Sequence, residues 1–411
     1  MSRRKKLSPI IVIFLTIFID LVGFGIIIPL SPYLSRTFGA SPAEIGWLMA
    51  IYSFMQFIFA PLWGRLSDRV GRRPIMLVSI LGGFVSYLGF AFATSFTGLF
   101  LARMFAGICG ANVSTAMAYI ADISSEKDRS KSMGLIGAAF GLGFIFGPII
   151  GGFAGEIGNK IGSVPPWGMN FGALVAATIS LINFLLALRI LDESLPLERR
   201  AINIANVKPS RFKMLFKHIR TPTVGPLIFL FFMSGLAMAH MESNLFIYVF
   251  DVFNWSQMKA NVGFAYVGVV MVITQGYLVR KLLPKFGESN LLPRGIFLMA
   301  IGFAGIGFAH STGVMALVMT ALALGNGLTN PSILGSISLL TDGSEQGEVM
   351  GVTQSLASLA RILGPPMGGF FYQTITPAAP FWVAGGISTI GLLLVITIKG
   401  KIPISGRQTN P

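Results

Sequence analysis

Long apolar runs separated by short polar breaks recur along the whole chain. Each run has at least the roughly 18 residues that a helix needs to cross a hydrocarbon core of ~30 Å. The runs cover residues 9–30, 43–63, 74–95, 98–121, 131–153, 167–190, 223–250, 260–279, 291–309, 313–339, 347–372 and 379–398. This pattern predicts an all-α integral membrane protein with twelve transmembrane helices.

The composition agrees with this prediction. Apolar residues make up 53% of the chain and charged residues 11%, whereas a soluble domain has about 25% charged residues. The basic start at residues 2–6 resembles that of a signal peptide. The apolar run after it is too long for a signal and has no small-residue cleavage site, so we expect a retained helix.

The net charge of +15 is an orientation signal. With the N-terminus in the cytoplasm, nearly all Lys and Arg fall on the cytoplasmic side, and the opposite side holds only Arg36, Lys160 and Lys259. This is the positive-inside rule, and it predicts that both termini are cytoplasmic. We therefore expect a lipid bilayer as the partner of this charge and no nucleic acid.

Motifs for cofactor or metal chemistry do not occur in the sequence. Cys109 is the single cysteine, the three histidines lack ligand spacing, and there is no Walker-type nucleotide loop. We expect no catalytic site, no cofactor and no metal. A transporter of this kind should run on an ion gradient.

The polar stretch at residues 189–220 divides the runs into six and six. Met133–Phe153 (MGLIGAAFGLGFIFGPIIGGF) aligns with Met350–Phe370 (MGVTQSLASLARILGPPMGGF), in which Met-Gly, Gly-Pro and Gly-Gly-Phe recur at one fixed offset. Duplicated halves are typical of secondary transporters, whose substrate site lies near the midplane between the halves. We therefore expect two pseudo-symmetric six-helix halves, 1–190 and 222–411, joined by a cytoplasmic basic linker, 191–221.

Two further motifs carry a family resemblance. GRLSDRVGRRP (Gly64–Pro74) resembles the signature between helices 2 and 3 of the major facilitator superfamily, and Leu99, Arg103 and Gly107 resemble its helix 4 element. The signature residues are Gly64, Asp68, Arg69, Gly71, Arg72 and Arg73. The fifth run fits the glycine-proline motif that marks antiporters in this superfamily, with Gly143, Gly147, Pro148, Gly151 and Gly152.

The amino-acid sequence of the first half is similar to those of tetracycline/proton antiporters and related 12-span drug exporters. This resemblance implies the major facilitator fold, a place in the inner membrane and proton-coupled antiport of a lipophilic or amphipathic drug-like compound by alternating access. It also implies a small-molecule substrate and function as a monomer. The alternatives are export of a metabolite (a sugar, amino acid or siderophore) on the same fold, or a non-transporting sensor or scaffold.

The charged loop is interpreted as a cytoplasmic gate. Asp68 can accept N–H groups at a helix N-terminus of the other half, and the arginines can pair with Asp122 or Asp128. The alternative is that the arginines only enforce orientation. In the fifth run the glycines allow close helix packing, and Pro148 predicts a bend because it lacks a backbone donor.

Ionisable residues inside the runs are the best pointers to mechanism, because a membrane-buried charge is expensive. Asp20, Arg103, Glu242 and Arg361 are the proton-coupling candidates; fixed ion pairs or snorkelling are the alternatives. Asp20 is ~18 Å along the first helix, close to the midplane. The resemblance also implies an acid in helix 9, but Leu291–His310 contains no Asp or Glu.

Several polar and aromatic side chains are candidates to line a substrate cavity: Gln56, Asn112, Phe144, His240, Gln275, Asn330 and Gln354. Aromatic and thioether side chains can repack around varied lipophilic ligands. The alternative for each is contact with lipid or with a neighbouring helix.

Overall fold

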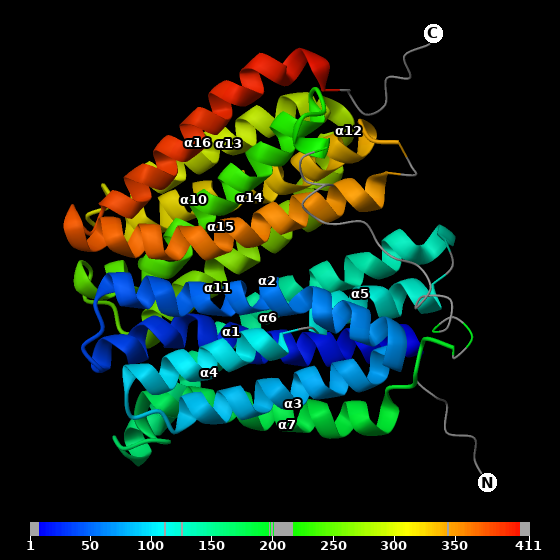
Figure 1. Ribbon diagram of the computed structural model, residues 1–411. Helices are drawn as coiled ribbons and strands as arrows, with labels where there is room; N and C mark the ends of the chain where they lie inside the picture. The colour runs from blue at the N-terminus through cyan, green and yellow to red at the C-terminus, as the bar shows by residue number, and fades with distance from the viewer. Residues whose placement is uncertain are drawn as a thin grey trace. The chain divides into compact units, whose positions relative to one another are not determined.

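The computed structural model in Figure 1 describes residues 8–110, 112–124, 126–196, 198, 200, 217–342 and 345–402, with the side chains of 112, 113 and 126–134 excepted. Every regular element within these residues is helical. The middle of the predicted linker, residues 201–216, lies outside the described residues.

The helices of the first half follow the predicted runs closely. They are α1 (Pro9–Thr37), α2 (Pro42–Val70), α3 (Arg72–Ala91), α4 (Phe96–Cys109), α5 (Asn112–Ile123), α6 (Glu126–Ile161), the 3₁₀ turn η1 (Gly168–Asn170) and α7 (Phe171–Ile190). The predicted fourth run, 98–121, corresponds to α4 and α5, which together form one candidate span, Phe96–Ile123. Gly110 at the end of α4 is not helical, and residue 111 lies outside the described residues.

The second half repeats this order. It comprises α10 (Val224–Asp251), α11 (Gln257–Ile273), the π-helical turn η2 (Thr274–Leu278), α12 (Val279–Phe286), α13 (Glu288–Ile306), α14 (Thr312–Leu339), α15 (Gln346–Thr374), α16 (Ala379–Ile398) and the 3₁₀ turn η3 (Lys399–Lys401). The eighth predicted run spans α11, η2 and the start of α12.

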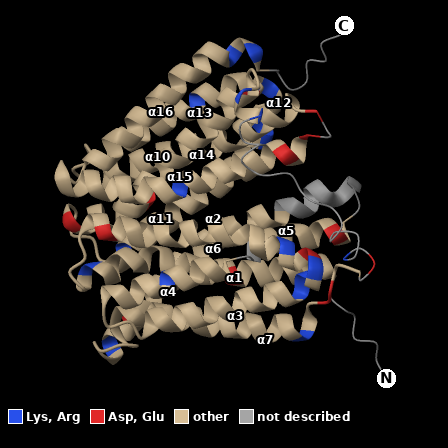
Figure 2. Ribbon diagram, in the orientation of Figure 1, with Lys and Arg blue, Asp and Glu red and all other residues tan. Residues whose placement is uncertain are grey.

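By length and composition, 11 helical stretches of the described residues could cross a membrane. α15 is not among them although it has 29 residues, and its sequence carries Glu348, Gln354 and Arg361. With α15 the helices account for all the predicted runs, and the predicted fold class is confirmed. Figure 2 shows charged residues concentrated at helix ends, with few in the middle of the helices.

Matching local structures recur in the two halves. Gly71 and Gly287 precede α3 and α13, with φ of 113° and 69°, a region that favours glycine. Ser95 and Ser311 are the N-caps of α4 and α14, and each hydroxyl accepts a hydrogen bond from the backbone N–H three residues later, at 3.2 and 3.3 Å. The duplication thus includes the helix starts as well as the apolar runs.

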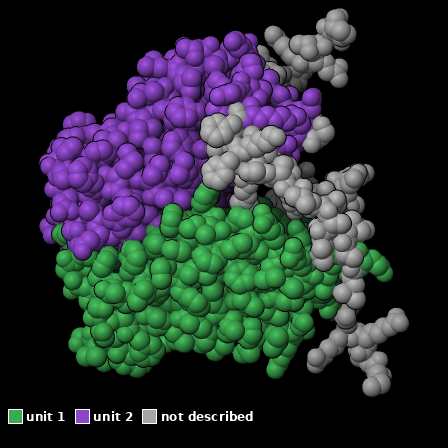
Figure 3. Space-filling model, in the orientation of Figure 1, with its two compact units in different colours: residues 1–40, 51–207, 257–265 green, residues 41–50, 208–256, 266–411 purple. Residues whose placement is uncertain are grey.

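The chain forms two compact units (Figure 3). Unit 1 contains Met1–Ala40, Ile51–Val207 and Gln257–Ala265, and unit 2 contains Ser41–Ala50, Lys208–Ser256 and Tyr266–Pro411. Each has an apolar core: Ile13, Ile80 and Ile136 lie in that of unit 1, and Leu227, Ile296 and Ile333 in that of unit 2. The predicted division of the chain into two halves at the linker remains a prediction. The two units are defined by packing, and each includes a short segment from the other half of the sequence.

A short segment of one helix completes each unit. In unit 1, the start of α11 packs on α6, so that a Cβ added at Gly152 would lie 2.6 Å from the Met258 sulfur. In unit 2, the start of α2 packs on α15, and a Cβ added at Gly46 would lie 2.9 Å from the Cα of Pro366. A larger side chain at Gly46 would collide with the α15 backbone, whereas one at Gly152 would require the Met258 side chain to shift.

Candidate functional site

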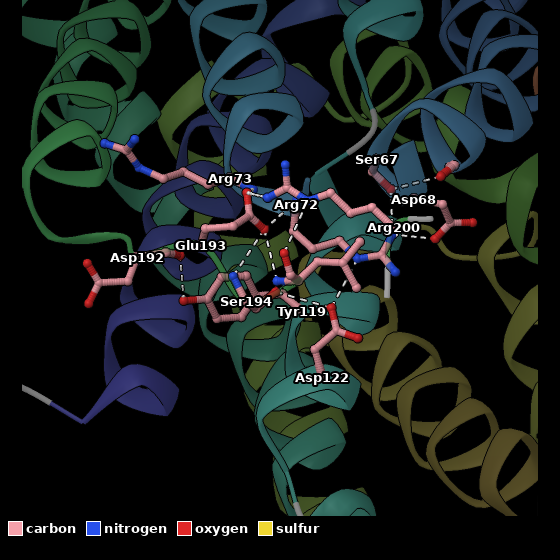
Figure 4. Close-up of polar contacts among 12 residues, drawn as sticks. Ser67, Asp68, Arg72, Arg73, Tyr119, Asp122, Asp192, Glu193, Ser194 and Arg200 are labelled. Carbon is pink, nitrogen blue, oxygen red and sulfur yellow. Dashed lines mark hydrogen bonds and ion pairs between the residues drawn. The ribbon is translucent and has the colours of Figure 1, made fainter. Parts of the chain in front are cut away.

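Arg72 is the centre of a polar cluster at the junction of α2 and α3. Its guanidinium pairs with Asp68 Oδ1 at 2.7 Å and with Asp122 Oδ2 at 3.1 Å, and Nη1 donates to Ser67 Oγ at 2.7 Å. The Arg72 side chain is only 8% exposed. We call Ser67, Asp68, Arg72, Asp122, Glu193 and Arg200 the loop cluster (Figure 4).

Glu193 supplies the N-terminal cap of α3. Its two carboxylate oxygens accept hydrogen bonds from the backbone N–H groups of Arg72 and Arg73, at 2.8 and 3.2 Å. A side chain at Gly71 would collide with this carboxylate. A carboxylate is favourable here because the first N–H groups of a helix have no partner within it and carry partial positive charge.

Arg200 supplies the matching cap at the end of α2. Its Nη1 donates to the Val70 carbonyl at 2.8 Å, and its Nη2 lies 3.5 Å from Glu193 Oε2. Glu193 and Arg200 therefore hold the α2–α3 junction from both sides. Sequence reasoning missed Glu193 and Arg200; the only available signal was that both lie in the polar stretch directly after the sixth run.

The other motif residues lie around this cluster. Arg72 is the motif arginine that pairs with Asp122, whereas the side chain of Asp128 lies outside the described residues. Arg73 Nη2 donates to the Leu188 carbonyl at 2.8 Å, and Arg69 is exposed. Among the described residues no atom lies within 4 Å of a Cβ added at Gly64, so this glycine makes no close contact with the described helices.

A second set of contacts surrounds Arg103 in the interior of unit 1. The Arg103 guanidinium lies over the rings of Phe24 and Tyr52, at 5.5 and 4.9 Å from their centroids, and the residue is 3% exposed. Its Nε has no hydrogen-bond partner in the described part of the chain. Tyr87 is in electrostatic range of both Arg103 and Asp20. Asp20 and Arg103 therefore both lie in electrostatic range of Tyr87.

Unit 2 holds the other two ionisable candidates. Glu242 on α10 interacts electrostatically with Arg361 on α15, and Arg361 Nη2 donates to Ser358 Oγ at 3.1 Å. His240 is fully buried, with Nδ1 2.9 Å from the Leu236 carbonyl and its ring stacked on Phe371. Its Nε2 has no partner among the described residues.

The glycines of α6 form a packing face against α1. A Cβ added at Gly143 would lie 2.8 Å from the Leu21 Cβ, and one added at Gly147 would lie 2.6 Å from the Gly25 Cα. Gly151 packs on Ile26 in the same way. The helix continues through Pro148.

Of the cavity candidates, Phe144 joins the group around Arg103, since its ring lies 6.4 Å from Phe24 and 6.1 Å from Phe264. Gln56 Nε2 donates to the Gly110 carbonyl at 2.9 Å, and Asn330 Nδ2 donates to Asn326 Oδ1 at 3.0 Å. Gln275 and Gln354 are exposed. The side chain of Asn112 lies outside the described part of the chain.

A polar cluster that the sequence did not predict joins the end of the linker to α15. Lys217 Nζ lies 2.8 Å from Glu345 Oε1, and His218 Nε2 lies 2.9 Å from Glu348 Oε1. The hydrogen bond between Lys217 and Glu345 raises the pKa of Lys217 and lowers that of Glu345. His218 is buried, but a single histidine in a polar stretch gives no sequence signal.

Comparisons with known proteins agree with this architecture. The family model described as Major Facilitator Superfamily matches residues 13–324 and 282–409. The tetracycline resistance protein, class E, of Escherichia coli is 33% identical over 399 residues, covering 96% of this chain and 95% of that protein. Multidrug resistance protein 2 of Bacillus subtilis is 28% identical over 402 residues, covering 97% of each chain.

Among solved structures, the human organic anion transporter TETRAN superposes with a TM-score of 0.70 at 26% sequence identity, covering 94% of this chain and 98% of that one.

Proposed function

Because this chain belongs to the Major Facilitator Superfamily of membrane transporters, we propose that it is a proton-coupled exporter of a lipophilic or amphipathic drug-like compound. It would work as an antiporter by alternating access. The relatives named for tetracycline and multidrug resistance, which match nearly the whole chain, support a drug-like substrate.

The observation that carries the coupling proposal is the placement of one acid and one arginine inside each unit. Asp20 lies on the first helix of the first half, in electrostatic range of Tyr87, which also interacts with Arg103. Glu242 lies on the first helix of the second half, in electrostatic range of Arg361. A membrane-buried carboxylate is stable beside a cation or when it is protonated. Withdrawal of the arginine would therefore load a proton, and its return would release it.

For the substrate, the aromatic group around Arg103 provides adaptable contact area. In unit 1 the Phe144 ring contacts the rings of Phe24, Phe140 and Phe264. Such surfaces accept varied lipophilic ligands because the rings repack without losing hydrogen bonds.

For the loop cluster, we propose that it is a cytoplasmic lock that forms and breaks during transport. The buried Arg72 pairs and the two helix caps support this role, since mere orientation would not require buried partners. We also propose that both termini lie in the cytoplasm, on the basis of the charge distribution. A place in the inner membrane and function as a monomer are further proposals, which do not rest on that charge.

The coupling proposal is tested by Asp20→Asn in proteoliposomes with an imposed pH gradient. The variant should bind substrate and fold but fail to accumulate it against the gradient. Glu156→Gln, which removes an exposed acid of the same unit, is the matched control and should behave as wild type. Normal substrate-induced proton movement with Asp20→Asn would contradict the proposal.

Glu242→Gln tests whether the second acid selects charge. If Glu242 faces the substrate, the variant should weaken export of cations and leave neutral compounds much less affected. Equal loss for both classes would assign Glu242 a coupling or structural role, and no loss would remove it from the site.

A second candidate function is export of an organic anion. The Nε of buried Arg103, which has no hydrogen-bond partner among the described residues, favours it. A guanidinium without its full set of acceptors can bind a carboxylate or enolate, and one structural relative is named as an organic anion transporter. A transport panel with tetracycline, lipophilic cations, neutral compounds and organic anions distinguishes the two. Accumulation of anions alone would overturn the drug proposal.

A further inference from the structure

The junction between α12 and α13 occupies the place in the second half that the α2–α3 junction has in the first. Gly287 precedes α13 as Gly71 precedes α3, and both have positive φ. The charges at the two junctions are placed differently. At the first, Arg72 is buried and paired with acids. At the second, four basic residues are exposed: Arg280, Lys281, Lys285 and Arg294.

This stretch of the chain brings no exposed acid to the second junction. Glu288 is the single Asp or Glu between residues 252 and 341, and it is 3% exposed. Figure 2 shows basic residues gathered around α12. The charge that α12 and the start of α13 present on their surface is therefore positive.

Two exposed aromatic rings accompany these cations. Tyr277 is 59% and Phe286 is 40% exposed. Lys281 Nζ lies 5.6 Å from the centroid of the Tyr277 ring, and the Arg294 guanidinium lies 5.0 Å from that of Phe286. Amphipathic pairs of this kind suit a membrane–water interface, where one side is apolar and the other is wet. We define the junction patch as Tyr277, Arg280, Lys281, Lys285, Phe286 and Arg294.

Helix length places the junction patch at the edge of a bilayer. The candidate span Gln257–Phe286 has 30 residues, or about 45 Å at 1.5 Å per residue. A hydrocarbon core is ~30 Å thick, so about ten residues extend beyond it. Residues 260–279 include no charged residue, which leaves the basic end, 280–286, for the headgroup region. The next candidate span begins at Glu288.

We propose that the junction patch is a docking surface for the headgroups of anionic phospholipids in the adjacent leaflet. Arg280 and Arg294 each offer a planar fork of N–H donors that fits a phosphate, and the two lysines add positive charge. The exposed rings favour a lipid over a soluble anion, because they contact the apolar side of the interface. This inference does not rest on the proposed transport function.

Binding of phosphatidylglycerol to the full chain in an uncharged detergent tests the proposal, with bound lipids counted by native mass spectrometry. Removal of one cation close to an anionic headgroup should weaken binding about 5-fold. Arg280→Gln/Lys281→Gln should therefore weaken the tightest phosphatidylglycerol site about 25-fold and leave phosphatidylcholine binding unchanged. The melting temperature without lipid should stay close to that of wild type, because both residues are exposed.

Lys399→Gln/Lys401→Gln is the matched control, because it removes two exposed cations at the end of another candidate span, Ala379–Lys401. It should bind phosphatidylglycerol as wild type does. Phe286→Leu keeps an apolar side chain but removes the ring beside Arg294. It should weaken binding about 2- to 5-fold.

Three results would overturn the proposal. Equal weakening in the two double variants would show that any basic helix end attracts anionic lipid. Equal affinity of the wild type for phosphatidylglycerol and phosphatidylcholine would exclude recognition of headgroup charge. Displacement of phosphatidylglycerol by inorganic phosphate, but not by sodium chloride of the same ionic strength, would assign the patch to a soluble anion. The measurement needs neither a transport substrate nor a proton gradient, so its outcome is independent of the proposed function.

Discussion

Replacement of Arg72 by alanine should destabilise the protein more than any other single change in the loop cluster. Arg72 is the common partner of Asp68 and Asp122, at 2.7 and 3.1 Å, and its removal leaves both carboxylates and the Ser67 hydroxyl without this donor. Arg72→Lys keeps the charge, but an ammonium group cannot reproduce the planar fork that serves three acceptors at once.

The magnitude follows from burial. Breaking a fully buried ion pair costs about 3–5 kcal/mol, whereas an exposed pair contributes about 0–1 kcal/mol. The Asp68 and Asp122 side chains are 18% and 13% exposed, so water recovers part of the loss. We expect a loss of about 2–3 kcal/mol for Arg72→Ala and about 1 kcal/mol for Arg72→Lys.

Thermal unfolding of the detergent-solubilised protein measures this difference, with Arg69→Ala as the control. Arg69 is an exposed arginine of the same motif, and its loss should change stability by less than about 0.5 kcal/mol. Adding Asp122→Asn to Arg72→Ala should recover part of the stability, because it removes one unpaired charge. Equal unfolding of Arg72→Ala and Arg69→Ala would refute the reasoning.

Two further predictions concern packing and pH. Gly147→Ala should destabilise the protein by about 1–3 kcal/mol, because the added Cβ would lie 2.6 Å from the Gly25 Cα. Gly137→Ala is the control, since the described residues leave open space around Gly137. It should be neutral or stabilising in the same thermal assay. Because the pKa of Glu345 is lowered, its pair with Lys217 stabilises the protein at pH values above the ordinary Glu pKa of about 4.3. This stabilisation is lost as the pH falls through the lowered pKa. The small difference in melting temperature between wild type and Lys217→Gln should therefore vanish in acid; a difference that persists there would contradict this assignment.

The fold could be predicted from the sequence because apolar runs of membrane-spanning length report directly on contact with lipid and with other helices. The loop motif likewise indicated the pairing of an arginine with Asp122. Residue pairs that are far apart in sequence were not accessible in this way. Glu193 and Arg200 cap α3 and α2 from positions 121 and 130 residues further along the chain, and no local pattern marks them.

The non-helical residue Gly110 at the end of α4 was not predicted, for a different physical reason. Hydropathy measures side chains, whereas a helix end is a matter of backbone geometry and hydrogen bonds. The segment Cys109-Gly110-Ala111-Asn112 is apolar enough to continue a span. Gln56 and Trp63 of α2 donate to the Gly110 and Ile108 carbonyls, and the sequence offers such donors equally to a ligand or to the backbone.

The segments that complete each unit also set an order of events during biosynthesis. Gly152 and Gly155 of α6 pack against Gln257 and Met258 of α11, which the ribosome makes much later. At about 5–20 residues per second, this face of unit 1 remains uncovered for on the order of 5–20 s after α6 has been made. Protease protection of nascent chains arrested before and after residue 265 would register the change. The first six spans thus insert without their final packing, and maturation of the first half waits for translation of the second.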